Sequence, residues 1–509
     1  MKARSNGAVR DWLGFGAMCV GMFVALLDIQ VVSAVLPAMG SALHTGLDRL
    51  SWIQTAYLTG EVIAVALSGR LSRALSTTGA FSAATIGFVI ASAGCAASSD
   101  FASLVVWRTI QGLCGGVIIP TVFSAGYRIF PKQLQARALL LAGGVAMLAP
   151  SLGPLVGGFI GERLSWNWVF LINVPTGIVV AATAYAAVHV DEPDPRAWKA
   201  IDLPALLGLA GSLTMLQVLL KLAPGDHWRS WRDLGLCCGT VLAGAVFVTR
   251  SVGARLPLVD LTPLKSTSFA AACALNFVVG SALYGCVYVL PLFLGFVRRH
   301  SSLEIGLIMT VMGATQLIAA PLATLASKRF SAAWLTAVGL ALFGAGLVLN
   351  AFSTPESDAA ALFWPQVLRG AAAMFCILPL TTAALDPQPQ GQLANASALL
   401  NLMRNLGGAI GIGIVDTVIN VRPPAIASHL TTMLLAGNRD AAAFVGLPTS
   451  LFRGTPLHGV GPAQLAFARP LVERAALTVA FNEAWLILGG LTIAALAITP
   501  LLRQNAPPP

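Results

Sequence analysis

The sequence predicts an all-α polytopic membrane protein with fourteen transmembrane helices, on the evidence of its composition and its long apolar runs. Of the 509 residues, 56% are apolar and only 10% are charged, whereas soluble domains carry roughly 25% charged residues. Mean hydropathy is strongly positive, at +0.79. A soluble globule needs far more polar surface to cover itself. The composition therefore excludes a soluble enzyme, a disordered scaffold and a disulfide-rich secreted domain.

The apolar residues gather in fourteen runs, each long enough to cross the ~30 Å hydrocarbon core of a bilayer as a helix. The runs lie near residues 12–36, 51–70, 79–98, 102–126, 138–160, 168–189, 201–221, 233–251, 268–296, 304–325, 331–351, 360–385, 393–420 and 478–502. Lys2, Arg4 and Arg10 precede the first run in the manner of a signal peptide. That run is too long for a signal peptide and lacks a small-residue cleavage site, so we interpret it as the first transmembrane helix.

The basic residues predict the orientation of these helices. An even number of helices places both termini on one side of the membrane. That side holds sixteen Lys and Arg residues, against seven in the short loops of the opposite side. Because basic residues concentrate in cytoplasmic loops, we expect both termini in the cytoplasm of a multi-pass inner (plasma) membrane protein. The net charge of +10 then reflects topology and indicates no nucleic acid partner.

Several ionisable residues fall inside the predicted helices, where each costs about 2.5–3.5 kcal/mol on insertion scales and so needs a partner or a water-filled cavity. A carboxylate whose surroundings alternate between dry and wet can take up and release a proton, so we favour a functional role for Asp28, Glu61 and Arg108. For Arg369, Arg404 and Glu483, ion pairs that only hold helices together are an equal alternative. The intramembrane residues are Asp28, Glu61, Arg108, Arg369, Arg404, Asp416 and Glu483.

The run 138–160 is unusually rich in glycine and proline. Prolines remove helix hydrogen bonds and kink the chain, and glycines let a neighbouring helix approach closely. This density favours a moving or sealing helix over a purely structural kink. The residues concerned are Pro150, Gly153, Pro154, Gly157 and Gly158.

No motif in the sequence indicates an enzyme, a metal site or a nucleotide. The eight cysteines include no C-x-x-C pair, and the six histidines show no paired ligand spacing. Nucleophile-elbow, zinc-protease and Gly-rich nucleotide motifs are missing from the sequence. We therefore expect no metal and no cofactor, and we regard ATP-driven export as disfavoured.

Seven stretches resemble motifs of the fourteen-span drug:proton antiporters, the EmrB/QacA-like branch of the major facilitator superfamily. Leu27–Pro37 resembles the span-1 motif, and Arg108, Gln111 and Gly112 stand where the span-4 motif has its Arg and Gln-Gly. The further matches are Ala149–Gly158 with the antiporter motif, Ser165–Pro175 with the span-6 signature, and Leu290–Leu294, Arg369-Gly370 with Pro379, and Asn405–Gly411 in the second half.

The chain departs from the family pattern at several positions. In the loop after the second run, Arg73 stands near an expected Asp and Ser76 replaces a Gly. Gln30 replaces a common Thr, Asn167 a common Arg, and Ala149 the first Gly of the antiporter motif. We expect the fold to tolerate these changes and the details of gating to differ.

The resemblance implies a major facilitator fold, with two six-helix bundles plus two extra central helices. The bundles would be residues 1–190 and 268–509, the latter including an extracytoplasmic loop 421–477. Residues 191–267 would form a linker and the two additional helices. The loop 421–477 contains short amphipathic pieces and would either contact a periplasmic adaptor or simply connect the last two helices.

The resemblance also implies proton-coupled export of amphipathic organic compounds by alternating access. Asp28 and Glu61 would carry protons, and Arg108 would tune the pKa of both carboxyl groups. Asp416 would add a second acidic site. The charge of the substrate stays open, because the carboxylates favour cations whereas Arg404 would equally admit anions. The expected partners are small amphipathic substrates, protons, membrane lipid, and a candidate periplasmic adaptor with its outer-membrane channel. The alternatives are an exporter or facilitator of a specific metabolite or siderophore-like product and, more remotely, a membrane-embedded enzyme.

Overall fold

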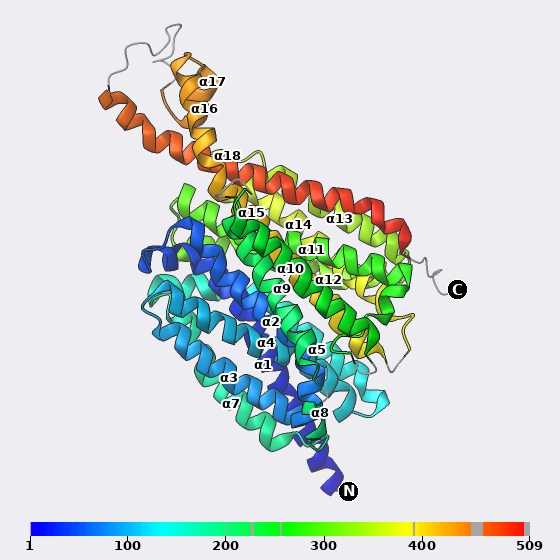
Figure 1. Ribbon diagram of the computed structural model, residues 1–509. Helices are drawn as coiled ribbons and strands as arrows, with labels where there is room; N and C mark the ends of the chain where they lie inside the picture. The colour runs from blue at the N-terminus through cyan, green and yellow to red at the C-terminus, as the bar shows by residue number, and fades with distance from the viewer. Residues whose placement is uncertain are drawn as a thin grey trace.

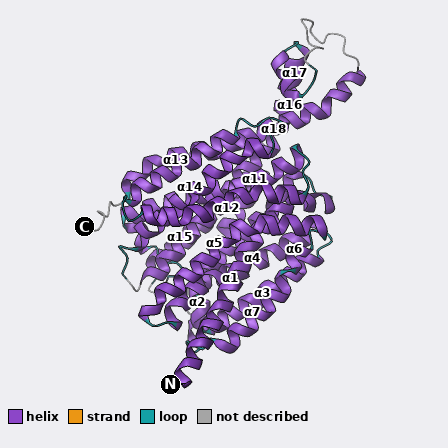
Figure 2. Ribbon diagram, turned by 180° about the vertical axis from the view of Figure 1, so that it is seen from behind, coloured by secondary structure: helices purple, strands orange, loops and turns teal. Residues whose placement is uncertain are grey.

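The computed structural model describes residues 2–199, 201–224, 229–254, 257–389, 392–448 and 462–502. Every regular element in these ranges is a helix (Figures 1 and 2). Fourteen of the helical segments are long and apolar enough to cross a membrane, and each corresponds to one of the fourteen apolar runs. The predicted fold class, a fourteen-helix all-α membrane protein, is confirmed.

The first half of the chain holds six membrane crossings, and two more follow. The helices are α1 (Lys2–Ala42), α2 (Leu47–Leu75), α3 (Thr77–Ala97), α4 (Phe101–Ile129), α5 (Lys132–Arg163), and a sixth crossing divided into α6 (Trp168–Leu171) and α7 (Asn173–Ala187). After these come α8 (Arg196–Lys199), α9 (Leu203–Leu222), α10 (Trp231–Gly253) and a short 3₁₀ turn η1 (Thr262–Lys265).

The second half begins with α11 (Thr267–Leu292), which ends in the π-helical turn η2 (Phe293–Val297). The remaining helices are α12 (Ser302–Ala326), α13 (Ala332–Asn350), α14 (Ala359–Leu385), α15 (Leu393–Val421), α16 (Pro423–Leu435), α17 (Arg439–Val445), α18 (Pro462–Ala494) and η5 (Ala495–Leu501). In α12, α13, α14 and α17 a side chain at the start of the helix accepts a hydrogen bond from a free backbone N–H group, as in the Ser301–Glu304 capping box of α12.

The helices form two bundles that meet along two main lines of contact. In the first bundle α2 packs on α4, α1 on α5 and α7, and α3 on α4 and α7; in the second, α11 packs on α15, α13 on α14 and α18, and α12 on α14. The bundles meet where α5 packs on α12 and α2 packs on α15. In Figure 1, α3 and α7 cover one flank of the molecule, and α13 and α18 cover the opposite flank.

The additional pair, α9 and α10, packs mainly on itself, but α9 also contacts α2 in the first bundle and α15 in the second. This helix therefore touches both halves of the molecule. The exact division of the chain at residues 190 and 267 stays a prediction.

The segment 421–477 differs from the loop that the sequence predicted. Where the structure describes it, it is mostly helical: α16, α17 and the first turns of α18 stand out from the body, at the end away from the N-terminus (Figure 1). Apolar side chains join the three helices, including Leu434 of α16, Val445 of α17 and Val472 of α18. At ~1.5 Å rise per residue, the 33 residues of α18 extend well beyond a ~30 Å hydrocarbon layer. Residues 449–461 lie outside the described ranges.

Candidate functional site

Asp28 lies in a fully buried polar cluster inside the first bundle. Its carboxylate forms an ion pair with Nη1 of Arg108, and both side chains are 0% exposed. The other carboxylate oxygen accepts hydrogen bonds from the amides of Gln111 at 3.0 Å and Asn173 at 2.8 Å. Gln111 also donates to the hydroxyl of Ser92 at 2.8 Å. Four helices, α1, α3, α4 and α7, are joined by this cluster.

The guanidinium of Arg108 is held from several sides. Its Nε donates to the carbonyl of Ile53 at 3.1 Å and its Nη1 to Gln111 at 2.6 Å. The group also lies over the rings of Tyr57 and Phe170, at 4.5 and 5.6 Å from their centroids, where a desolvated cation is stabilised. Nη2 alone has no hydrogen-bond partner in the part of the chain that the structure describes.

The sequence grouped Asp28 with Arg108 and placed Gln111 in the span-4 motif, but it did not predict that Gln111, Asn173 and Ser92 surround Asp28. Asn173 lies within the stretch that resembles the span-6 signature, so a signal for it was present. Ser92 carried no sequence signal. Gly112 of the same motif has a packing role, because a Cβ there would lie 2.1 Å from the carbonyl oxygen of Tyr57.

Glu61 lies apart from this cluster, on α2 at the line where the two bundles meet. The residue is only 2% exposed, and its Oε2 has no hydrogen-bond partner among the described residues. The side chain of Asn405, on α15, interacts with the carboxyl group, and Tyr284 of α11 donates to Asn405 at 3.3 Å. The hydrogen-bond donors of Arg108 are directed to Asp28, Gln111 and the backbone carbonyl of Ile53, so a tuning effect of Arg108 on Glu61 stays a prediction. Glu61 instead faces the second bundle.

Asp416, which the sequence suggested as a second acidic site, is held by two buried partners. It forms an ion pair with Lys221 of α9 and accepts a hydrogen bond from the hydroxyl of Tyr288, of α11, at 2.5 Å. Lys221 also donates to the backbone carbonyl of Asp48, in α2, at 2.5 Å. Lys221 is the last residue of the apolar run 201–221, and its side chain is only 9% exposed. The pair thus joins both bundles through one of the additional helices.

The three other intramembrane candidates have different surroundings. Glu483 forms a bidentate ion pair with Arg422 on a partly exposed surface. The Nε and Nη2 atoms of Arg422 donate to the two carboxylate oxygens at 2.7 and 2.8 Å. Arg404 donates from Nε to Asn276 of α11 at 3.2 Å. Arg369 of α14 is completely buried, and its Nη1 and Nη2 have no hydrogen-bond partner among the described residues. None of the three joins Asp28 or Glu61.

The Gly-Pro motif of α5 packs between α1 of its own bundle and α12 of the other. A Cβ at Gly157 would lie 2.4 Å from the carbonyl oxygen of Val31, and one at Gly158 would lie 2.5 Å from that of Ser302. Conversely, a Cβ at Gly306 of α12 would lie 2.3 Å from the carbonyl oxygen of Pro154. Small residues are needed here because the helix backbones approach so closely.

The motif continues this pattern at Gly153, where a Cβ would lie 2.3 Å from the Cβ of Gln30 on α1, and at Pro150, whose carbonyl faces Gly313 of α12. Farther along α5, Gly143 and Gly144 have no neighbouring atom within 4 Å of such a Cβ. A side chain at Gly143 or Gly144 would therefore meet open space, in contrast to the tight packing at Gly157 and Gly158.

The turn between α2 and α3 shows how the chain compensates for its departures from the family pattern. Ser76 has a φ of 68° in place of the expected Gly. Next to it, Asp191 of the linker accepts from the backbone N–H and the hydroxyl of Thr77, both at 2.9 Å, and pairs with Arg128 at 2.6 Å. An acidic residue is thus supplied to this turn from the linker.

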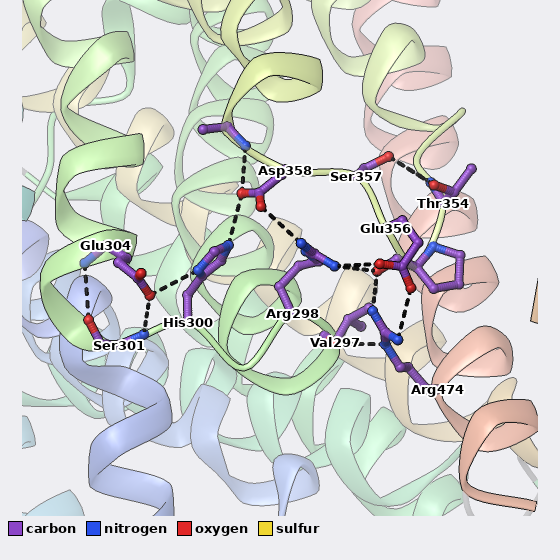
Figure 3. A network of polar contacts seen from close by, with 12 residues as sticks. Val297, Arg298, His300, Ser301, Glu304, Thr354, Glu356, Ser357, Asp358 and Arg474 are labelled. Carbon is purple, nitrogen blue, oxygen red and sulfur yellow. Dashed lines mark hydrogen bonds and ion pairs between the residues drawn. The ribbon is translucent and has the colours of Figure 1, made fainter. Parts of the chain in front are cut away.

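A second polar network lies in the other bundle, between the turn after α11, the start of α12 and the loop before α14 (Figure 3). His300 lies between Glu304 and Asp358, at 2.9 Å from each. Arg298 pairs with Asp358 at 2.9 Å and with Glu356 at 3.0 Å, and it holds the pKa of the Asp358 carboxyl below its usual value. This network connects the start of α12 with the loop that leads into α14. Among the described residues, no group of three His, Cys, Asp or Glu side chains is arranged to hold a metal ion.

Comparisons with known proteins agree with this arrangement. The sequence profile of the Major Facilitator Superfamily matches residues 18–412. The Colistin resistance protein EmrB of Acinetobacter baumannii is 35% identical over 412 residues, which make up 80% of each chain. The Multidrug export protein EmrB of Escherichia coli K12 is 28% identical over 429 residues, 84% of each chain. Among solved structures, a bacterial homolog of the human lysosomal transporter Spinster, inward-facing and unoccupied, matches with a TM-score of 0.62 and 14% identity, over 98% of this chain and 99% of that one.

Proposed function

Because this chain belongs to the Major Facilitator Superfamily, we propose that it exports amphipathic organic compounds across the inner membrane in exchange for protons. The observation that carries this proposal is the position of Glu61, buried at the contact between the bundles with one carboxylate oxygen unpartnered in the described part of the chain. An ionised carboxylate without a bonded cation is costly in such a place. Movement of the bundles that brings water to this group would therefore change its proton occupancy.

Alternating access in this proposal is a rocking of one bundle against the other. The packing of α5 on α12 is tight at Gly158, where a Cβ would lie 2.5 Å from the carbonyl oxygen of Ser302, whereas a Cβ at Gly144 would meet open space; we propose that the two bundles separate toward that end. Opening at the Gly158 end and closing at the Gly144 end would give the opposite state. Glu61 lies on α2, at its contact with α15. Because the separation of these two helices would differ between the two states, water would reach the carboxyl group in one state and not in the other, and Glu61 would take up or release its proton accordingly.

Asp28 and Arg108 would act inside the first bundle. Protonation of Asp28 removes the counter-charge of a guanidinium that is 0% exposed, and removal of one partner from a buried pair is strongly unfavourable. The helices that the cluster joins would then rearrange. In this way proton uptake at Asp28 would be coupled to movement of α1 and α4.

The proton gradient alone would supply the energy, with no cofactor. Both termini would lie in the cytoplasm, which places α16, α17 and the start of α18 outside the membrane on the opposite side. We propose this projection as the contact surface for a periplasmic adaptor that leads to an outer-membrane channel. The alternative is that it only returns the chain to α18. Deleting residues 425–470 and measuring co-purification of the adaptor separates these two roles.

Transport into inverted membrane vesicles under an imposed pH gradient tests the proposal. A growth-inhibition panel first identifies a compound that the expressed protein exports. Asp28→Asn and Glu61→Gln are each expected to abolish gradient-driven uptake of that compound. The matched control is Glu483→Gln, which removes an acidic side chain from a partly exposed ion pair and is expected to keep uptake.

Two results would contradict the proposal. Full gradient-driven uptake by both variants would show that the two acids do not carry the coupling. Equal uptake with the gradient collapsed would reject antiport itself and favour a facilitator of a specific compound.

A further inference from the structure

The last turn of α9 is bound to both bundles at the outer end of the molecule (the end at which α1 leads into α2). The ammonium of Lys221 forms an ion pair with Asp416 of α15, in the second bundle. It also donates to the backbone carbonyl of Asp48, in the first turn of α2 of the first bundle, at 2.5 Å. The side chains of Lys221 and Asp416 are only 9% and 3% exposed. One buried cation therefore bridges the contact between α2 and α15.

Other bonds fix this part of α9 to the second bundle. The hydroxyl of Thr417, on α15, donates to the carbonyl of Leu220 at 3.0 Å, and carbonyls in the last turn of a helix have no partner within that helix. A Cβ at Gly413 of α15 would lie 3.0 Å from the side chain of Leu220, so the two helices are closely packed. If α2 moves away from α15, α9 would therefore stay with the second bundle, and the bond from Lys221 to Asp48 would break.

The inner half of α9 meets α2 in a different way. Val62 and Ala66 of α2 belong to the same apolar cluster as Leu209 and Leu213 of α9. Apolar burial is non-directional, so α2 can tilt there and keep its apolar surface covered. The bond of Lys221 needs a short distance and a suitable angle, and it is lost when the helices separate. We therefore expect α9 to respond to movement of α2 at its outer end.

The dry surroundings of Lys221 make its bond to the first bundle favourable. A lysine ammonium carries three donors, and a buried donor that loses its acceptor is costly. Separation of α2 from α15 would take the carbonyl of Asp48 away from Lys221, and the ammonium would need water in its place. The bond therefore favours the arrangement in which the outer ends of α2 and α15 are together.

The other contact between the bundles, that of α5 with α12, is tight at the same end. Gly158, near the end of α5, packs against the first residue of α12, and a Cβ there would lie 2.5 Å from the carbonyl oxygen of Ser302. Because alternating access moves the bundles largely as rigid bodies, the two contacts should open together. A bond at the contact of α2 with α15 would then also influence the contact of α5 with α12.

We propose that Lys221 is a latch that holds the outer ends of the two bundles together, and that α9 carries this latch as part of the second bundle. One of the two additional helices thereby gains a function in the transport cycle, which is to stabilise the state that is closed at the outer end. The inference rests on the proposed rocking movement and adds its regulation. Opening of the outer end requires Lys221 to exchange the carbonyl of Asp48 for water.

Hydrogen–deuterium exchange of the purified full-length protein in phosphatidylcholine nanodiscs at pH 7 tests the proposal. The test variant is Lys221→Met with Asp416→Leu, which removes the latch without leaving an unpaired charge in the interior. Residues 154–163 and 302–309 report on the outer ends of α5 and α12, away from both substitutions. We expect their backbone amides to exchange at least about fivefold faster than in the parent protein, which is the low end of typical coupling between two sites.

The inner half of α5 supplies the second readout. Amides of residues 138–146 are expected to exchange more slowly in the test variant, because rocking closes one end of the contact as it opens the other. Helices α3 and α7, on the flank of the first bundle, serve as an internal reference and should exchange equally in all the proteins.

The matched control is Arg422→Met with Glu483→Leu. It also removes both charges of an ion pair at the outer end, but Arg422, which follows α15, and Glu483, on α18, both belong to the second bundle. This control is expected to leave the exchange of α5 and α12 unchanged.

Unchanged exchange at the outer ends of α5 and α12 in the test variant would overturn the latch. So would an equal effect of the control, or faster exchange at both ends of α5, which would indicate general loosening and not rocking. No proton gradient is present in nanodiscs, so a failure here leaves the coupling experiment in vesicles unaffected. A loss of proton coupling in vesicles would in turn leave the latch intact, since a facilitator also alternates between two states.

Discussion

From the buried ion pair between Lys221 and Asp416 we predict how strongly each of a series of substitutions changes the stability of the protein. Its two side chains are only 9% and 3% exposed, so each charge depends on the other for its counter-charge. Replacing Lys221 with Met leaves Asp416 buried and unpaired, and breaking a buried pair in this way costs about 3–5 kcal/mol. Lys221→Met is therefore expected to destabilise the protein strongly.

Two further variants follow from the same geometry. Tyr288→Phe removes the single hydrogen bond of 2.5 Å that its hydroxyl donates to the carboxylate, which is worth roughly 1.5–3 kcal/mol for a charged acceptor. The double variant Lys221→Met with Asp416→Leu removes both charges at once. Because apolar replacement of a whole buried pair is often neutral or stabilising, we expect the double variant to be more stable than Lys221→Met alone.

The assay is heat-induced unfolding of the purified variants in detergent at pH 7, followed by fluorescence. The midpoints are expected to increase in the order Lys221→Met, Tyr288→Phe, parent protein, with the double variant above Lys221→Met. A midpoint for Lys221→Met equal to that of the parent would refute the reasoning. So would a double variant whose midpoint is no higher than that of Lys221→Met, because removing both charges of a coupled buried pair should cost less than removing one.

Three other positions give further expected outcomes. Ser76→Gly should raise the unfolding midpoint, because Ser76 has φ 68° and ψ 163°, a region essentially restricted to glycine that costs another residue about 1–3 kcal/mol, while replacing a helix cap by glycine costs only a few tenths. Gly158→Ala should impair transport and lower the midpoint, because its Cβ would lie 2.5 Å from a backbone oxygen of α12, whereas Gly144→Ala has open space within 4 Å and should do neither. Asp358→Asn should lower the midpoint at pH 7. Because Arg298 holds the pKa of the Asp358 carboxyl below its usual value, the stabilisation is present above that usual value and disappears as the pH falls through the lower folded-state pKa. The difference between the parent protein and Asp358→Asn should therefore vanish in acid, as midpoints measured between pH 7 and pH 3 will check.

Each of these three outcomes has a clear opposite. A lower midpoint for Ser76→Gly would mean that the side-chain cap outweighs the backbone strain. Equal behaviour of Gly158→Ala and Gly144→Ala would show that the contact between α5 and α12 does not restrict function. A difference for Asp358→Asn that persists unchanged into acid would assign its effect to packing and not to charge.

Much of the fold was predictable because the membrane imposes a simple constraint. Every backbone polar group in hydrocarbon must be paired within the segment, so a long apolar run becomes a helix. All fourteen runs do so. The sequence did not predict that the segment 421–477 forms a helical projection, because its apolar residues bury against one another and not against lipid. Such mutual burial leaves only short amphipathic patterns in the sequence.

The contacts of the candidate site were likewise predictable from the sequence only in part. The sequence linked Asp28 with Arg108 as intramembrane charges, and the span-4 motif placed Gln111 one helical turn from Arg108. Nothing in the sequence paired Lys221 with Asp416, which are 195 residues apart. The surroundings of Arg369 were equally invisible, because the neighbours of a buried side chain depend on which helix faces meet.

The sequence by itself determined that the chain crosses a membrane fourteen times, which residues are too polar to be there without a purpose, and where glycine permits close helix contact. These properties follow from composition and local spacing, which act on each helix separately. Only the tertiary structure decided which buried charges are neutralised and which are not. Asp28 and Asp416 have cationic partners, whereas Glu61 and Arg369 each keep unpaired atoms among the described residues. Whether a charge in a low-dielectric interior is structural or available to a ligand depends on neighbours within a few ångströms, and those come from helices distant in the chain.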